Sequence, residues 1–265
     1  MRAVSLLYHD VVLPGQLSSS GFRGGDADIY KLTLPDFEHH LDAIRSAIPR
    51  PPATASQLGD MSRTPFLLTF DDGGVSAHEH VASLLEEFGW HGHFFVTTYW
   101  IGREGFLNAA QIRDLHARGH FIGSHSCSHP ARMSYCSRQQ LRREWNESIA
   151  VLSDILGAKV DIASVPGGYY GRNVAEEAAD AGIKTLFTSE PQTQADIVNG
   201  CWILGRYTIK DGVKPATAAA VASGRMLPRL QQFAYWNTKK LLKTAGGGSW
   251  IRMRKRILAR QSNRD

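Results

Sequence analysis

Two carboxylates and two imidazoles stand just after two short apolar runs of the sequence. The run at 66–70 leads into Asp71 and Asp72, and the run at 121–123 leads, after one serine, to His125 and then His129. One aspartate and two histidines can supply three ligands to a divalent metal and leave one position open for water, as in catalytic zinc sites. The second aspartate is then available to take a proton. These residue types at this spacing predict metal-assisted hydrolysis.

Each half of this pattern also has a simpler interpretation. The Asp-Asp-Gly-Gly sequence at 71–74 is a common turn, because aspartate accepts local backbone hydrogen bonds and glycine tolerates a positive φ. Two histidines four residues apart can lie on a polar surface or form hydrogen bonds within a core. Both pairs, however, follow predicted buried parallel strands, and chemistry in (β/α) barrels collects at the carboxyl ends of such strands. The joint placement favours a functional site.

Three segments resemble the motifs of one enzyme family. TFDDG at 69–73, HSCSH at 125–129 and SVPGGY at 164–169 are similar to successive motifs of the polysaccharide deacetylases, the NodB-homology group of carbohydrate esterase family four. The resemblance covers about residues 1–210. It implies a metal-dependent hydrolase that removes N-acetyl groups from N-acetylhexosamine units of a polysaccharide or its precursor.

The resemblance also implies roles for individual residues. Asp71 becomes the catalytic base, and Asp72, His125 and His129 become the ligands of a divalent ion, with Zn²⁺ as the first expectation. The backbone N–H of Gly167 is expected to stabilise the oxyanion together with the metal. Apart from the resemblance, Tyr169 and Tyr170 are expected at the substrate because aromatic rings stack on sugar rings, and Arg206 is grouped with them.

The chain departs from the family pattern in two places. Ser164 stands where the family has an arginine that tethers the base, so either that support is absent or another cation provides it, with Arg206 and Arg172 as the candidates. No histidine follows residue 129, so the late histidine that protonates the leaving amine is absent. The YHD sequence at 8–10, at the end of a predicted strand, resembles the start of permuted poly-N-acetylglucosamine deacetylases, where an early histidine takes that place. His9 is therefore the expected general acid; the alternative is a hydrogen-bonded histidine at a strand end.

Predicted strands and helices alternate along the chain. Apolar residues at helical spacing predict helices at 34–48 and 141–155, and short apolar runs predict strands between them. This alternation predicts an α/β fold, a distorted (β/α) barrel with fewer than eight regular units, formed by residues 1–224. A polar, Gly-rich insert at 15–30 follows the proposed acid, and it either lines the substrate cleft or is disordered.

The last segment, 225–265, is expected to be a separate basic amphipathic helical tail. It holds eleven Lys or Arg and one acid, whereas the whole chain has a net charge of +5, so positive charge is concentrated there. Basic residues interleaved with Trp and Leu suit the headgroups of an anionic membrane. The alternatives are a solvated tail or a nucleic-acid patch. Since no nucleic-acid-binding module is recognisable, no nucleic-acid partner is expected.

Cysteine content and the N-terminal sequence bear on the compartment. Three cysteines in no framework spacing favour a reducing environment; Cys127 is either a fourth metal ligand or a small packed side chain. His9 and Asp10 interrupt the first apolar run before it reaches the length of a signal-peptide core, and no stretch reaches the length of a membrane span. We therefore expect a cytoplasmic protein, with the tail allowing a peripheral position on the inner membrane face.

Two other functions fit parts of the pattern. A non-catalytic carbohydrate-binding protein on the same scaffold is compatible with the missing arginine and late histidine. A metal-dependent hydrolase of a small amide needs the same metal ligands. Asp71 favours an enzyme over a binding protein, because binding alone does not need a free carboxylate beside a metal ligand.

Overall fold

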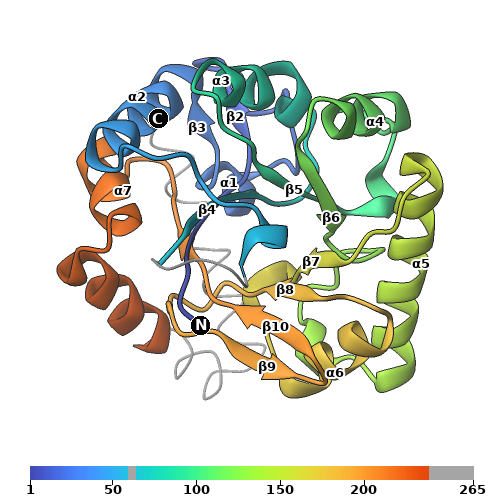
Figure 1. The fold of residues 1–265 in the computed structure, drawn as a ribbon. Helices are drawn as coiled ribbons and strands as arrows, with labels where there is room; N and C mark the ends of the chain where they lie inside the picture. The colour runs from blue at the N-terminus through green and yellow to red at the C-terminus, as the bar shows by residue number, and fades with distance from the viewer. Residues whose placement is uncertain (59–63, 239–265) are drawn as a thin grey trace.

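The fold is built on a curled, mostly parallel sheet surrounded by helices (Figure 1). The structure is a computed structural model that describes residues 1–58 and 64–238. Nine strands form the main sheet in the order β11-β1-β4-β5-β6-β7-β8-β10-β9, and all neighbours are parallel except β9 and β10. The strands are β1 (Val4–Tyr8), β4 (Phe66–Phe70), β5 (His93–Val96), β6 (Phe121–Ser124), β7 (Ile162–Ser164), β8 (Thr185–Phe187), β9 (Asp196–Val198), β10 (Cys201–Leu204) and β11 (Tyr207–Thr208).

Helices form an outer layer around this sheet. The longer ones are α2 (Leu34–Ala47), α3 (Ala82–Glu87), α4 (Ala109–Ala117), α5 (Arg138–Leu156), α6 (Arg172–Asp180) and α7 (Pro215–Ala222). Short elements at the ends of strands are β2 (Val11–Val12), β3 (Leu32–Thr33), α1 (Gly25–Asp28), η1 (Ala55–Gln57), the π-helix η2 (Ala77–Val81), η3 (Thr98–Trp100), η4 (Met133–Tyr135) and η5 (Pro166–Gly168). The predicted α/β class and distorted barrel are confirmed.

One nearly continuous segment closes the sheet into a barrel. β10 pairs with β8, whereas β11, which begins only three residues after β10 ends, pairs with β1. Residues 201–208 thus connect the two sides of the sheet, and Arg206 lies at the bend between the two strands. No helix separates β10 from β11, and the hairpin strand β9 stands where a helix would connect β8 to β10. The barrel therefore has fewer than eight regular units, as predicted.

Local sequence signals fix the two longest predicted helices. The Thr33 side chain caps α2 by accepting from the N–H of Asp36. At α5, Ser137 and Gln140 form a reciprocal capping box, and Gly157 ends the helix in the left-handed conformation. The predicted apolar stripe of α5 faces the core, where Trp145 is fully buried.

The described part of the expected tail is helical and packs on the barrel. Residues 226–238 form a helix, which follows α7 in Figure 1. Arg229 Nε donates to the carbonyl of Val221 at 3.1 Å, and Gln232 Nε2 donates to the carbonyl of Thr208 at 3.3 Å. The expected boundary at 224 therefore does not separate residues 226–238 from the barrel. The rest of the expected tail, 239–265, lies outside the described residues.

Among residues 1–58 and 64–238, no helix combines the length and apolar character that crossing a membrane requires.

Candidate active site

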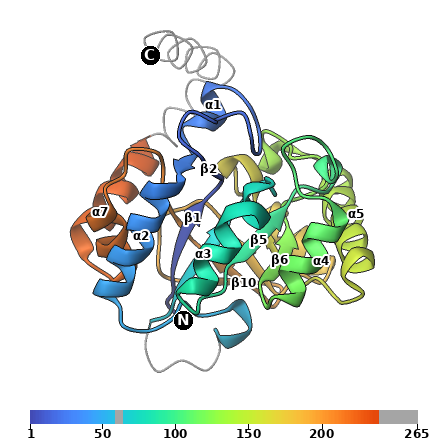
Figure 2. The same cartoon turned by 90° about the horizontal axis from the view of Figure 1, so that it is seen from above.

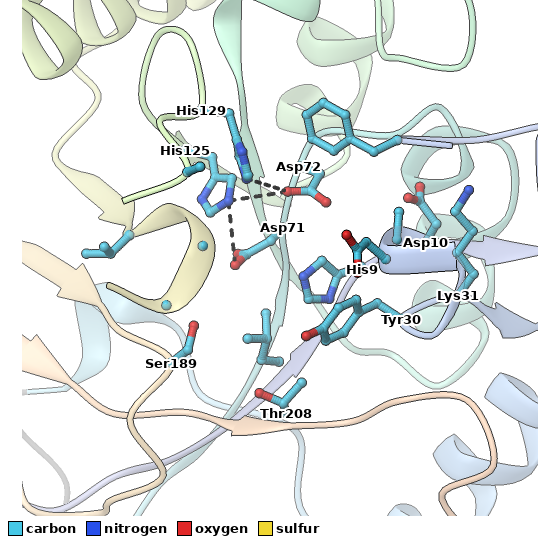
Figure 3. Close-up of a pocket in the computed structure, with 18 of the residues that line it drawn as sticks. His9, Asp10, Tyr30, Lys31, Asp71, Asp72, His125, His129, Ser189 and Thr208 are labelled. Atoms are coloured by element: carbon cyan, nitrogen blue, oxygen red, sulfur yellow. Dashed lines mark ion pairs between the residues drawn. The ribbon is translucent and has the colours of Figure 1, made fainter. Parts of the chain in front are cut away.

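The carboxyl ends of neighbouring strands bring the candidate residues to one end of the barrel. His9 follows β1, Asp71 and Asp72 follow β4, and His125 follows β6. These side chains and His129 face a common cavity of about 420 Å³ (Figure 3). Figure 2 shows α1, part of the insert after β1, above the same end of the barrel. The sequence-predicted centre is therefore assembled from strands far apart in the chain.

Three side chains have their donor atoms turned toward one another. Asp72 Oδ1 lies 3.3 Å from His125 Nε2 and 3.4 Å from His129 Nε2, and one ligand atom from each residue lies within 4.8 Å of the others. One carboxylate and two imidazoles are a donor set that suits Zn²⁺ and related divalent ions. Cys127 is not in this group, because its Sγ contacts Glu147 at 3.5 Å. The donor chemistry and the convergence of these three residues fit a metal ion.

The tautomer of His125 also fits metal binding. Its Nδ1 lies 2.6 Å from Ser164 Oγ, and that hydroxyl donates in turn to Asp71 Oδ1 at 3.0 Å. Since the serine proton is directed to Asp71, His125 Nδ1 must be the donor to Ser164. Its Nε2 then carries the lone pair that faces Asp72, as in metal-bound histidines held by a hydrogen bond on the other nitrogen.

The backbone around these residues adopts a conformation that non-glycine residues rarely adopt. The φ angles are 75° at Asp72, 64° at Ser126 and 60° at His129. Such residues typically cost about 1–3 kcal/mol each and persist where the surrounding structure holds them, frequently at functional sites. The positive φ at Asp72, two residues after β4 ends, turns the chain so that the consecutive carboxylates face different neighbours. Asp72 faces the two histidines, and Asp71 faces Arg206 in the barrel interior.

Asp71 is held by a buried arginine. Arg206 Nη1 and Nη2 donate to Asp71 Oδ1 and Oδ2, both at 2.7 Å, and Arg206 has no exposed surface. Burial alone would raise the pKa of Asp71, but the Arg206 guanidinium and His125 outweigh it and hold that pKa below its ordinary value. Asp71 is therefore ionised at neutral pH and fixed in orientation.

Arg206 supplies the charge missing at Ser164. Of the two arginines predicted for this place, Arg172 lies on the surface of α6, where it pairs with Glu176 at 3.1 Å. Arg206 lies behind Asp71 and is not among the residues that line the cavity, which corrects its expected grouping with the substrate contacts. The physical reason is the barrel closure, which turns the side chain between β10 and β11 into the interior.

His9 lies beside the two carboxylates. Its ring packs on Tyr30 with 4.7 Å between centroids, and Nδ1 is buried without a hydrogen-bond partner among the described residues. Burial lowers the pKa of His9, although the charges of Asp72 and Asp71 act in the opposite direction. The imidazole is therefore neutral at neutral pH. The alternative interpretation of His9, a histidine held by a hydrogen bond at a strand end, does not apply to its Nδ1, which has no such bond among the described residues.

A buried aspartate that had no predicted role connects the insert to the site. Asp10 Oδ1 accepts from Ser20 Oγ at 2.6 Å and from Ser76 Oγ at 2.9 Å. A Cβ at Gly21 or Gly74 would come within 2 Å of this carboxylate, so neither position has room for a side chain. Burial raises the pKa of Asp10 to about 6. The insert is thereby ordered and lines the cavity; its contributing residues are Phe22, Arg23, Asp26, Ala27 and Tyr30.

Of the substrate contacts predicted at and just after the third motif, two line the cavity and one does not. Gly167 and Tyr169 line it. Gly167 has a φ of 66°, and a Cβ there would lie 2.9 Å from the carbonyl oxygen of Ala131, so the close approach requires glycine. Tyr170 is not among the lining residues; it packs against a buried apolar cluster that includes Trp145, and burial raises its pKa to about 12. The expected substrate contact of Tyr170 is corrected accordingly.

Comparisons with known proteins agree with these motifs. Residues 59–186 match the family model described as polysaccharide deacetylase. YxkH of Bacillus subtilis is 25% identical over 154 residues, which cover 58% of this chain and 54% of that protein. A 30.6 kDa protein of Geobacillus stearothermophilus is 25% identical over 137 residues, which cover 51% of this chain and 50% of that protein. The chain thus spans about half the length of these curated relatives.

Solved structures share the fold. The Streptococcus pyogenes deacetylase PplD, in complex with acetate, superposes with a TM-score of 0.71 at 17% identity, covering 84% of this chain and 98% of that one. IcaB from Ammonifex degensii superposes with a TM-score of 0.67 at 19% identity, covering 83% of this chain and 97% of that one. At these identities the likeness concerns the fold.

Proposed function

Residues 59–186 belong to the polysaccharide deacetylase family, and from this premise we propose that the protein is a metal-dependent hydrolase of N-acetylhexosamine units in a polysaccharide or its precursor. The reaction adds water across the acetamide bond and releases acetate and a free amine. The observation that supports it most is the division of the two adjacent carboxylates. Asp72 faces two histidines, whereas Asp71 is outside that trio and is held ionised by Arg206.

Asp72, His125 and His129 would hold the metal, with Zn²⁺ as the ion that best suits the donors. Such an ion supplies Lewis-acid polarisation of the acetamide carbonyl and makes water more acidic. The remaining functions, oxyanion stabilisation by the backbone and proton transfer, are proposed for residues of the chain. Gly167 brings its backbone against the cavity, where its N–H is proposed to donate to the developing oxyanion.

Proton transfer is assigned to two residues that follow neighbouring strands, Asp71 after β4 and His9 after β1. Asp71 takes a proton from the attacking water, because its carboxylate is ionised and lies beside the proposed metal ligands. Its Oδ2 is 3.9 Å from His125 Nε2. His9 donates a proton to the departing amine. Since burial makes His9 neutral at the start, it must first receive the proton that it later donates. Asp71 gains a proton from the water and His9 gives one to the nitrogen, so the proton on Asp71 must pass to His9, by way of solvent, before the amine departs. With that transfer both residues return to their starting charge after each turnover.

The alternative functions make different use of the same residues. A carbohydrate-binding protein would not require Asp71 to be held ionised beside the trio, at the cost of burying a charged pair. A hydrolase of a small amide would not require a cavity of about 420 Å³ edged by aromatic residues from the insert and from the third motif. Both features support a catalytic site for a sugar polymer.

Acetate release from N-acetylglucosamine oligomers tests the proposal. The protein is stripped with a chelator and assayed with and without added Zn²⁺, beside an Asp71→Asn variant as the matched control. We expect release by the metal-loaded wild type only. Equal activity of Asp71→Asn would remove the base from the mechanism. Hydrolysis of a small acetamide with none on any oligomer would favour the small-amide alternative.

We also propose that segment 225–265 holds the protein on an anionic membrane from the cytoplasmic side. Met226, Leu227 and Leu230 are more than half exposed, and nine of the eleven basic residues of the segment follow residue 238. Each basic residue near an anionic surface contributes about 1 kcal/mol. Full-length protein should sediment with anionic vesicles in a salt-sensitive way, and a version ending at Thr238 should bind less. Equal binding of both versions would refute docking by the segment after Thr238.

A further inference from the structure

The helix at 226–238 brings an aromatic side chain to the cavity from the far end of the chain. Trp236 lines the cavity together with the proposed catalytic residues and metal ligands that follow the strands. The helix is fixed at the barrel by the hydrogen bonds of Arg229 and Gln232. The Arg229 guanidinium also lies over the ring of Tyr207, 5.6 Å from its centroid. The helix at 226–238 therefore packs on the barrel and also contributes a side chain to the cavity.

The indole of Trp236 lies directly against the third motif. A Cβ at Gly168 would come within 2.8 Å of Trp236 Cη2, so the indole packs on the backbone of that glycine. Gly168 follows Gly167, the proposed oxyanion donor, in the chain. The indole is thereby placed next to the part of the site where the acetamide would be held, and it is only partly buried.

Two residues with hydroxyl groups line the same cavity, and one of them, Ser189, lies near the same glycine as the indole, with its Cβ 3.7 Å from the position of a Cβ at Gly168. Ser189 and Thr208 both line it, and Figure 3 shows them together on the side away from the two histidines. A flat apolar ring and hydroxyls that line one cavity match the two kinds of surface on a pyranose, whose axial C–H groups form an apolar face and whose hydroxyls form a polar edge. Charged groups are not needed for such a contact.

We propose that Trp236 forms a subsite for a sugar ring adjacent to the unit that is deacetylated. This inference rests on the proposed function and deepens it, because it selects a polymer or oligomer over a single sugar. The indole provides a stacking face, and Ser189 and Thr208 provide hydrogen-bonding partners for the ring hydroxyls. Trp236 acts on binding and leaves proton transfer to Asp71 and His9.

The test compares Trp236→Ala and Trp236→Phe with wild type on N-acetylglucosamine and on its tetramer. An aromatic stacking contact of this kind predicts a roughly tenfold higher KM for the tetramer in Trp236→Ala, with kcat within about threefold and a smaller change in Trp236→Phe. Activity on the monomer should change less than twofold. Phe233→Ala, an aromatic truncation at a half-exposed position on the same helix, should leave both substrates unaffected.

Binding without turnover separates this inference from the proposed function. Calorimetry with the tetramer is carried out on Asp71→Asn and on the double variant Asp71→Asn, Trp236→Ala. A roughly tenfold weaker binding by the double variant supports the subsite. Unchanged binding, or an equal loss of activity on monomer and tetramer in Trp236→Ala, would overturn it while leaving the hydrolase intact. If wild type neither binds nor cleaves the tetramer, the proposed function fails and the subsite fails with it.

Discussion

The buried pair of Asp71 and Arg206 makes a quantitative prediction. Both side chains are almost fully buried, at 3% and 0% exposure, and two hydrogen bonds of 2.7 Å join them. Arg206→Met leaves a buried carboxylate with Ser164 as its remaining close donor. Removing one partner of a buried ion pair typically costs about 3–5 kcal/mol, because the other charge stays buried and unpaired. For a chain of this size that corresponds to a fall in Tm of about 10 °C.

A double-mutant cycle isolates the pair. Arg206→Met and Asp71→Asn should each lose several kcal/mol of unfolding free energy, whereas the double variant removes both charges and should lose clearly less than their sum. Arg206→Lys should fall between, because lysine keeps the charge but cannot form the two parallel hydrogen bonds. The assay is urea unfolding of chelator-treated protein at pH 7, so that metal binding does not contribute.

The pH dependence has a definite sign. The folded-state pKa of Asp71 lies below its ordinary value of 3.8, so the pair stabilises the fold above that pH. The difference between wild type and Arg206→Met should therefore be constant near neutral pH and decrease as the pH falls below about 4. Additive losses within about 0.5 kcal/mol, or a loss below 1 kcal/mol for Arg206→Met, would refute the reasoning.

Three further predictions concern the metal, the acid and the insert. His125→Ala and Asp72→Ala should lose bound metal and turnover, whereas Asp71→Asn should keep the metal and lose turnover; metal content of the purified variants checks this, and an empty Asp71→Asn would contradict the division of the carboxylates. His9→Ala should retain metal and lower kcat by about 10²–10⁴-fold, which steady-state kinetics measures, and near-normal kcat would exclude it as the acid. Asp10→Asn should stabilise the metal-free protein by up to about 3 kcal/mol above pH 6 and by little near pH 4. The reason is that the folded-state pKa of Asp10 is raised to about 6, so the wild-type protein loses stability as the pH rises from 3.8 through 6. Thermal unfolding across this pH range measures the effect, and a Tm difference that does not change with pH would contradict it.

Local sequence signals were sufficient for the barrel and for the residues that follow its strands. Apolar runs, helix caps and the three motifs predicted where Asp71, Asp72, His125 and His129 meet, because parallel strands place their carboxyl ends at one edge. They could not predict the partner of Asp71. Tyr207–Thr208 is a two-residue strand, too short for a periodic signal, and its pairing with β1 is what turns Arg206 inward.

The remaining differences have similar causes. Tyr170 directly follows Tyr169, the last residue of the third motif, but a one-residue step changes which side of the chain a side chain faces. Trp236 lies in a basic segment that we expected to be separate from the barrel. Its contact with Gly168 comes from tertiary packing between distant parts of the chain, which no local sequence pattern indicates. Asp10 lies in the YHD sequence at 8–10, but that motif did not predict its hydrogen bonds, because its partners Ser20 and Ser76 come from two separate loops.

The bend between β10 and β11 has a consequence for biosynthesis. A chain emerging from the ribosome has synthesised the three proposed metal ligands by residue 129. The guanidinium that holds Asp71 arrives only with residue 206, next to the strand β11 that docks on β1. Until then the carboxylate has no cationic partner inside the barrel. Nascent chains and N-terminal fragments would thus lack the ion pair that orients the proposed base, even when all three proposed metal ligands are present. Because the arginine lies at the bend that closes the barrel, Asp71 becomes oriented only after the barrel has closed.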